Sequence, residues 1–408
     1  MKRRDIIKGL TILPLSTGLV SKASAMGLTD TPTTPKKQER DLFKELGVRT
    51  FINARGTITF MSGSLMHDYV LEAISDSSKD FCMLEELQDK VGERIAKMVH
   101  SEAALVSAGA FSALMLGMAG ILTGTDLKKV EQLPQLEGTG MKSEVIIQKG
   151  HKIDYNHAFI NCGAKLIYVE TPDDVDRAVN EKTASMHFLG SGAPNGKIMH
   201  EEWIALANKH NLPTSIDIAA NIPPLSNLWK FNNMGFSFVA LSGGKAIRGP
   251  QSSGILMGKK EIIAAARLNS SPHSGTIGRG MKVNKEEIIG MYVALERYIS
   301  QDHDKEWKDW EDRVSLIAKT AETVNGVTTN SYVPPIADHS PTLDISWDTD
   351  KIKLSGNEML DNLRKGNPSI EAYGGGKNSI TVSPWMMKPE QVKIVAVRIK
   401  EELIKASA

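Results

Sequence analysis

Residues 240–256 read ALSGGKAIRGPQSSGIL, in which Lys245 lies in a glycine-flanked turn between two apolar runs. A lysine in such a turn is held on a rigid frame, away from the solvated surface where most lysines lie. An amine becomes a useful nucleophile when its ammonium is partly desolvated or crowded by a second cation, and Arg248 is close enough in sequence to act in this way. The turn therefore indicates an imine-forming lysine, with an ordinary surface-turn lysine as the alternative.

An aspartate ends the apolar run that precedes this segment, because residues 214–220 read TSIDIAA and Asp217 follows a buried-strand candidate. A carboxylate at the end of a buried strand is costly unless a cation answers it. A protonated pyridine nitrogen is such a cation, and a Schiff-base lysine with an acidic partner for that nitrogen is a mark of pyridoxal phosphate enzymes. The alternative is that Asp217 only caps the turn that follows.

A strand, a turn of small residues and a helix are predicted further upstream, where residues 106–115 read VSAGAFSALM. Small residues at a helix start let backbone N–H groups close on a phosphate, helped by the helix dipole. The turn is weak evidence alone, because every protein with alternating strands and helices has similar turns. The order strengthens it: the turn comes first, then Asp217, then Lys245, each at a predicted strand end.

Short apolar runs alternate with helix-like segments from about Leu42 onward, which predicts an α/β protein with a mostly parallel sheet wrapped by helices. The predicted strands are Ala103–Val106, Glu144–Ile147, Lys165–Val169, Thr214–Asp217 and Phe238–Leu241, and the predicted helices are 201–210, 285–297, 356–363 and 389–404. Such sheets bind ligands at the carboxyl ends of their strands. We expect a large domain at 41–324 and a smaller α+β domain at 325–408.

The charge balance disfavours a nucleic acid as the main ligand, because 49 Lys and Arg against 48 Asp and Glu leave a formal charge of +1. The 41% hydrophobic and 24% charged residues are typical of a soluble globular protein. Cys82 and Cys162 form no Cys/His cluster, so no metal site is indicated, and one disulfide is left open.

The first 25 residues read MKRRDIIKGLTILPLSTGLVSKASA and have the basic start, apolar run and small-residue exit of an export signal. The paired Arg3 and Arg4 resemble a twin-arginine signal, which predicts a periplasmic protein. The apolar run is too short, and too broken by Pro14 and Gly18, for stable membrane insertion. A linker at 26–40 follows. The alternative is a cytoplasmic protein with a basic amino terminus.

Taken together, these segments resemble the fold-type I (aspartate aminotransferase-like) pyridoxal phosphate enzymes. Within them the chain looks like the selenocysteine synthase-like group, which includes L-seryl-tRNA(Sec) selenium transferase and D-glucosaminate-6-phosphate ammonia-lyase. The segments that carry the resemblance are 53–57, 63–66, 86–88, 133–134, 140–146, 155–158, 242–254 and 277–287. The stretch 242–254 is highly specific, and the resemblance covers roughly residues 45–405.

The resemblance implies roles for residues around the cofactor. Lys245 is the Schiff-base lysine and Asp217 is the partner of the pyridine nitrogen. The phosphate is cradled by the turn residues Ser107, Gly109 and Ala110. Ser242 is a further hydroxyl donor to it. His151, just past a predicted strand, is expected to stack on the cofactor ring, with His157 as the competing candidate.

The resemblance also implies how substrate and partner subunits are bound. Arg279 is the candidate for gripping a substrate carboxylate or phosphate, with a structural salt bridge as the alternative. These enzymes usually build their sites at a dimer interface, so a homodimer or higher oligomer is expected, with Gln251 and Ser252 reaching the neighbouring subunit's phosphate.

The reaction implied is removal of an α-proton by Lys245 and α,β-elimination from a small hydroxy amino acid or aminosugar acid, with release of ammonia. The alternatives are a selenium transferase, a racemase or an aminotransferase on the same fold, or a binding protein that has lost catalysis. The near-neutral charge favours a small amino acid over a tRNA.

Overall fold

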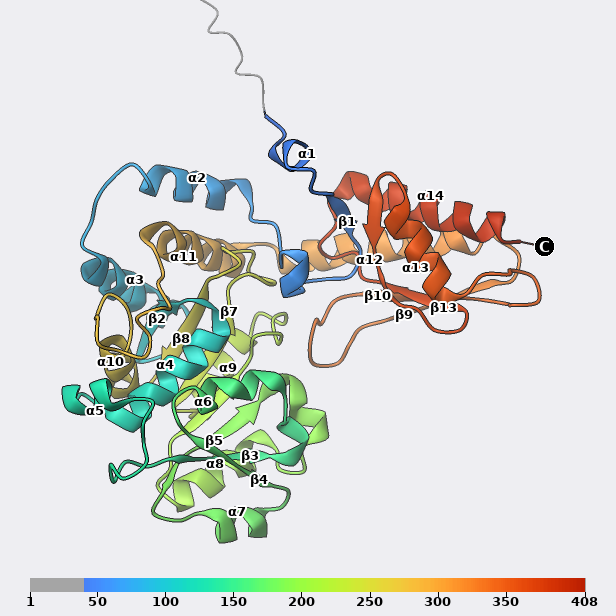
Figure 1. Ribbon diagram of the computed structural model, residues 1–408. Helices are drawn as coiled ribbons and strands as arrows, with labels where there is room; N and C mark the ends of the chain where they lie inside the picture. The colour runs from blue at the N-terminus through green and yellow to red at the C-terminus, as the bar shows by residue number, and fades with distance from the viewer. Residues whose placement is uncertain (1–39, 408) are drawn as a thin grey trace, which may run out of the picture. The chain divides into compact units, whose positions relative to one another are not determined.

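The computed structural model describes residues 40–407 of the chain (Figure 1). The predicted export signal at 1–25 lies outside the described residues, as does the linker except for its last residue, so export to the periplasm stays a prediction. Within the described part, no helix is both long enough and apolar enough to cross a bilayer.

The centre of the fold is a mostly parallel sheet, which in residues 40–407 has seven strands in the order β2-β8-β7-β6-β5-β3-β4. The strands are β2 (Ala103–Ser107), β3 (Glu144–Gln148), β4 (Lys165–Val169), β5 (Thr183–Leu189), β6 (Thr214–Asp217), β7 (Phe238–Ser242) and β8 (Gly254–Gly258). Only β8 runs antiparallel to its neighbours. The predicted α/β class, with a mostly parallel sheet, is confirmed.

Helices cover this sheet, as expected for strands that are buried along almost their whole length. They are α2 (Asp68–Ser77), α3 (Leu84–Met98), α4 (Gly109–Thr123), α5 (Leu127–Gln132), α6 (His157–Ile160), α7 (Pro172–Ala178), α8 (His200–Lys209), α9 (Asn227–Met234), α10 (Lys260–Leu268) and α11 (Lys285–Ser300). Helix α4 packs on β7 and β8. A Cβ at Gly117 would lie 2.7 Å from the Phe238 ring, so a side chain there would push α4 off the sheet.

The C-terminal part has its own antiparallel sheet, in the order β12-β13-β10-β9. Its elements are α12 (His303–Ala321), β9 (Val327–Tyr332), β10 (Thr342–Trp347), α13 (Gly356–Lys365), β11 (Ser369–Glu371), β12 (Tyr373–Gly374), β13 (Ser379–Val382) and α14 (Pro389–Lys405). The early strand β1 (Phe51–Asn53) pairs in parallel with β11 and joins the apolar core of this part. A smaller α+β domain after the large sheet is thus observed.

The exact domain boundary at 324/325 stays a prediction, because Thr50–Ala408 form one compact unit. Helix α12 explains why: Trp310 packs into the core around the large sheet, while Val314 and Ile317 of the same helix pack into the C-terminal core. The short helix α1 (Leu42–Glu45) precedes this unit. Cys82 is exposed and Cys162 is buried, and both are free thiols.

Candidate active site

The lysine turn connects β7 to β8 and is closed by its own backbone hydrogen bonds. Gly249 N–H donates to the Gly243 carbonyl at 2.9 Å, and Arg248 N–H donates to the Lys245 carbonyl at 3.0 Å. Ser64 Oγ donates to the Gly244 carbonyl at 3.0 Å from a distant part of the chain. These contacts give the rigid frame that the glycine-flanked sequence predicts.

Lys245 and Asp217 line the same cavity, which has a volume of about 700 Å³. The geometry follows from the sheet: β6 and β7 are parallel neighbours, and Asp217 stands beside Ala240 in the register. Both side chains therefore lie at the carboxyl edge of the sheet, where such folds bind ligands. Residues 152–155 line the same cavity. Two of the residues predicted from sequence to act together are thus brought together.

Asp217 is 7% exposed and accepts a hydrogen bond from Ala219 N–H at 2.8 Å. Burial raises the pKa of this carboxyl, and the Ala219 N–H and the Lys245 ammonium oppose that rise. A buried carboxylate of this kind is stabilised when a cation contacts it. The site is therefore prepared for a positively charged group beside Asp217.

The predicted phosphate turn lies at the same edge of the sheet. Ser107 of β2 and Ser242 of β7 are both paired with Gly254 of β8, the strand between them. The two hydroxyl-bearing residues therefore lie on either side of Gly254. Helix α4 begins at Gly109, which has φ of 84°, and the preceding Ala108 provides no side-chain cap. The first N–H groups of α4 are therefore left for another acceptor, and a phosphate is the natural one.

Gly254→Ala is expected to disturb this turn. An added Cβ would lie 2.5 Å from the Gly109 carbonyl carbon and 2.9 Å from the Ala110 nitrogen, so the turn must shift. We expect a loss of about 1–3 kcal/mol in the free energy of unfolding, together with weaker retention of the cofactor. Gly280→Ala is the control, because nothing lies within 4 Å of a Cβ there. Equal melting temperatures and equal retention after dialysis in the two variants would contradict this packing.

His151 lies behind the cavity wall. Its side chain is fully buried, its Nδ1 accepts from Leu189 N–H at 3.3 Å, and its ring meets Phe188 edge-on at 4.4 Å between centroids. Burial lowers the pKa of His151 to about 4, so the ring is neutral. The structure does not bring His151 to the Lys245–Asp217 cavity, because the bond to Leu189 turns the ring toward the interior. The competing candidate His157 is exposed at the start of α6.

Arg279 and the two residues expected to reach a partner subunit also lie away from this cavity. Arg279 is in the connection between α10 and α11, with Nη1 3.5 Å from Ser271 Oγ. Gln251 Nε2 donates to the Thr59 carbonyl at 2.9 Å, and Ser252 Oγ donates to Glu287. Binding of substrate by Arg279 stays a prediction, as does a homodimer.

The sequence predicts that Arg248 crowds Lys245, but the structure places the two side chains apart. The Arg248 side chain lines a neighbouring cavity with Ser64 and His67. Asp338, which was not among the residues predicted from the sequence, lies close enough to Lys245 for their charges to interact. Asp338 is in the loop between β9 and β10, and its N–H donates to the Ala220 carbonyl at 3.1 Å. No local pattern marks this residue, since only the folding of the C-terminal part onto the end of β6 places it there.

These residues fit pyridoxal phosphate. The phosphate fits the uncapped start of α4 beside Ser107 and Ser242, the ring nitrogen fits Asp217, and the aldehyde carbon fits the amine of Lys245. The cavity volume of about 700 Å³ is in the range of cofactor sites.

Curated proteins with known functions include several that are similar to this chain. D-glucosaminate-6-phosphate ammonia lyase from Salmonella typhimurium is 23% identical over 374 residues, or 88% of this chain and 97% of that one. 5'-C-glycyluridine monooxygenase-decarboxylase from a Streptomyces species is 25% identical, over 89% of this chain and 92% of that one. L-seryl-tRNA(Sec) selenium transferase from Mannheimia succiniciproducens is 25% identical over 61% of this chain, which spans about half (52%) of that relative.

Solved structures show the same fold, although no family model matches the sequence. The structure of D-glucosaminate-6-phosphate ammonia-lyase superposes with a TM-score of 0.78 at 22% identity, over 90% of this chain and 99% of that one. Serine palmitoyltransferase from S. paucimobilis, with bound pyridoxal phosphate, gives 0.54 at 12% identity, over 87% of each chain. By its relatives, its fold and its site, this chain is a pyridoxal phosphate-dependent enzyme of fold type I, related to the selenocysteine synthase-like group.

Proposed function

We propose that this enzyme is an ammonia-releasing lyase that acts by α-proton abstraction and α,β-elimination on a small hydroxy amino acid or aminosugar acid. The observation that carries the proposal is the placement of Lys245 and Asp217 on one cavity of about 700 Å³, at the carboxyl edge of the sheet. The similarity to an ammonia lyase over nearly its whole length supports the elimination reaction.

Pyridoxal phosphate, when bound, accepts the electron pair left when a bond to the substrate's α-carbon breaks. Lys245, once the substrate amine has displaced it, is free to take the α-proton as general base. With the cofactor bound, Asp217 would hold the positive charge on the ring nitrogen, and the start of α4 would hold the phosphate. The hydroxyl on the β-carbon would leave with its bonding electrons and take the proton that Lys245 had removed, which gives water. The enamine released hydrolyses to an oxo acid and ammonia.

The selenium transferase reaction is the weaker candidate for this chain. A protein that grips a tRNA needs a basic surface, whereas the formal charge here is +1. Racemisation, amino transfer and decarboxylation begin at the same α-carbon, and the products distinguish them from elimination.

A substrate screen tests the proposal. The holoenzyme is incubated with D- and L-hydroxy amino acids and with aminosugar acids, with and without a 6-phosphate. We expect ammonia and an oxo acid in equal amounts from at least one compound, without carbon dioxide. Lys245→Ala is the matched negative control. Racemised substrate, carbon dioxide or a keto–amino exchange as the main product would replace elimination with one of the alternatives.

A further inference from the structure

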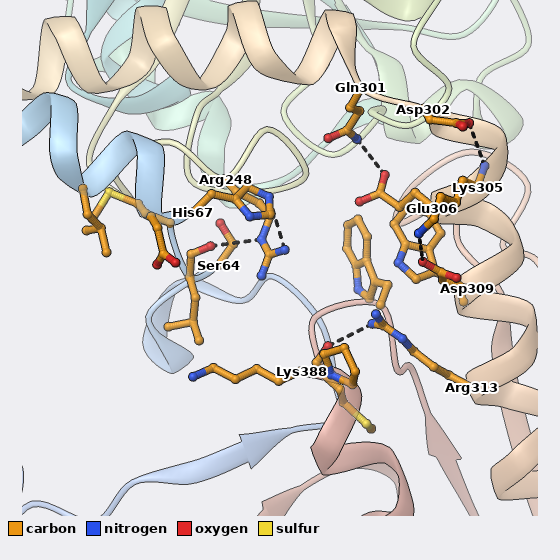
Figure 2. A pocket seen from close by; sticks show the side chains of 18 residues that line it. Ser64, His67, Arg248, Gln301, Asp302, Lys305, Glu306, Asp309, Arg313 and Lys388 are labelled. Atoms are coloured by element: carbon orange, nitrogen blue, oxygen red, sulfur yellow. Dashed lines mark hydrogen bonds and ion pairs between the residues drawn. The ribbon is translucent and has the colours of Figure 1, made fainter.

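A second cavity, of about 780 Å³, adjoins the lysine turn and is not used by the proposed reaction (Figure 2). Ser64 lines it and also holds the Gly244 carbonyl, next to Lys245. Four cationic side chains line it: Arg248 from the lysine turn, Lys305 and Arg313 from α12, and Lys388 from the residue before α14. Lys305 is paired with Asp309, which leaves the other three.

The two guanidinium groups are fixed in place by neutral acceptors. Arg248 Nε donates to the Leu65 carbonyl at 3.0 Å, and its Nη1 is 3.4 Å from His67 Nε2. Burial, followed by the charge of Arg248, lowers the pKa of His67 to about 4, so this ring is a neutral neighbour at pH 7. Arg313 Nη1 donates to the carbonyl of Met387 at 2.9 Å and to that of Pro384 at 3.3 Å.

Neither arginine has a carboxylate partner. Within residues 40–407, no Asp or Glu oxygen lies within 4.0 Å of the nitrogens of Arg248 or Arg313. Partial burial is the main cause of the lowered pKa of both groups, and the charge of Glu306 opposes the shift at both. A partly buried cation without a direct ion pair is unfavourable, so the two guanidiniums are suited to an anionic ligand.

The acidic side chains of the cavity already have partners of their own. Lys305 Nζ lies 3.2 Å from Asp309, and Lys305 N–H is held by Asp302 at 2.9 Å. Glu306 accepts from Gln301 Nε2 at 2.8 Å, and burial raises its pKa, a rise that the charges of His303, Arg248 and Arg313 oppose. Asp68 lies in the first turn of α2, where the helix dipole stabilises it. The charges of Glu306 and Asp309 act on the arginines without a direct contact, Glu306 on both Arg248 and Arg313 and Asp309 on Arg313. Each acid therefore has a nearer partner than the guanidiniums, which keep donors free for a further anion.

The backbone of Arg248 gives an independent indication. Its φ is 57°, in the left-handed region that residues with a Cβ rarely adopt. Glycine would take this conformation without strain, so an arginine at this position is held in the turn at a cost. Strained backbone conformations of this kind are concentrated at ligand-binding positions, where the strain helps to place a side chain for binding.

We propose that this second cavity binds the carboxylate or phosphate group of a small polar ligand, through Arg248 and Arg313 with Lys388 beside them. The ligand acid is either a group on the substrate itself or a separate metabolite, and both have the same chemistry at these side chains. The inference does not depend on the proposed lyase reaction, because it concerns binding.

The test uses the holoenzyme, in which the cofactor's own phosphate fills the first site, and measures binding of inorganic phosphate and of citrate by isothermal titration calorimetry. We expect saturable binding of one of these anions to the wild type and at least about a tenfold weaker association in Arg248→Gly and in Arg313→Gln. Arg248→Gly removes the strained residue, so it should melt no lower than the wild type. Lys128→Gln, an exposed lysine on α5, removes a charge elsewhere and should bind as the wild type does.

Failure to bind either anion, or equal binding by the wild type and both arginine variants, would overturn the proposal. An equal loss of binding in Lys128→Gln would overturn it too, by showing a general charge effect. Once a substrate is known, competitive inhibition by the bound anion identifies the substrate's own acid group as the ligand. Non-competitive inhibition identifies a separate metabolite.

Discussion

Lys245→Ala is expected to lose catalysis by about 10²–10⁴-fold or more and to lose the visible absorption band of the protein-bound cofactor. The large effect follows from the two roles proposed for one amine, since Lys245 would both hold the cofactor covalently and remove the α-proton. No other lysine replaces it, because Lys152, which also lines the cavity, is not held in the closed turn between β7 and β8.

The control is Lys97→Ala, an exposed lysine in the last turn of α3, which should keep both the band and the rate. The two variants are compared by ammonia release and by the absorption spectrum after dialysis. An added small amine should restore part of the rate of Lys245→Ala, because its cavity remains. A variant that keeps its band and its full rate would show that Lys245 is not the reacting lysine.

Asp217→Asn is expected to have effects of opposite sign on stability and on catalysis. In the folded cofactor-free chain, burial raises the Asp217 pKa above its unfolded value of about 3.9. A buried carboxyl of this kind destabilises the folded chain only when it is ionised. The free energy of unfolding therefore falls as the pH rises from the unfolded pKa through the folded pKa, and it stays lower above that pH. Asparagine carries no charge. The cofactor-free variant should therefore melt higher than the cofactor-free wild type at pH 8, with a smaller difference at pH 4.

The holoenzyme should show the reverse. Removing the carboxylate leaves the ring nitrogen without its anion in a buried site, which costs about 3–5 kcal/mol. The expected consequence is a loss of about 10²-fold or more in the elimination rate, with faster loss of cofactor on dialysis. Thermal melts of both forms at the two pH values, with kinetics on the holoenzyme, check this. A cofactor-free Asp217→Asn chain that melts lower at pH 8, or a holoenzyme with an unchanged rate, would contradict the assignment.

The residues of the candidate site whose positions follow from the sequence are those set by one strand and the turn after it. Asp217 ends β6 and Lys245 follows β7, and parallel strands bring their carboxyl ends to one edge without further information. Ser107 and Ser242 come together for the same reason, through their shared neighbour Gly254. The sheet itself is predictable where a strand contains an unbroken apolar run, as in residues 145–147 of β3 and 238–241 of β7.

The parts that could not be predicted depend on contacts between distant segments. Strand β5 carries Ser185 and His187 in its fully buried run, and such polar residues hide a strand until their partners are known. His187 Nδ1, for example, is paired with Ser215 Oγ at 2.9 Å on the neighbouring strand. Asp338 reaches Lys245 only because the loop after β9 packs against Ala220.

Arg248 and His151 illustrate a different limit, which is the direction of a side chain. Arg248 is three positions from Lys245, but its left-handed backbone points it into the second cavity with Ser64. His151 follows β3 as expected, but its bond to Leu189 turns the ring into the interior. Distance along the chain does not determine which face of a turn a side chain occupies.

The central claim is that Lys245 forms the covalent bond to pyridoxal phosphate, and borohydride reduction tests it most directly. The native holoenzyme is reduced, digested and examined by peptide mass spectrometry, so that any lysine joined to the cofactor is permanently labelled. We expect a single phosphopyridoxyl group on the peptide that contains Lys245. Labelling of a different lysine, or no labelling after the cofactor has been supplied, would contradict it.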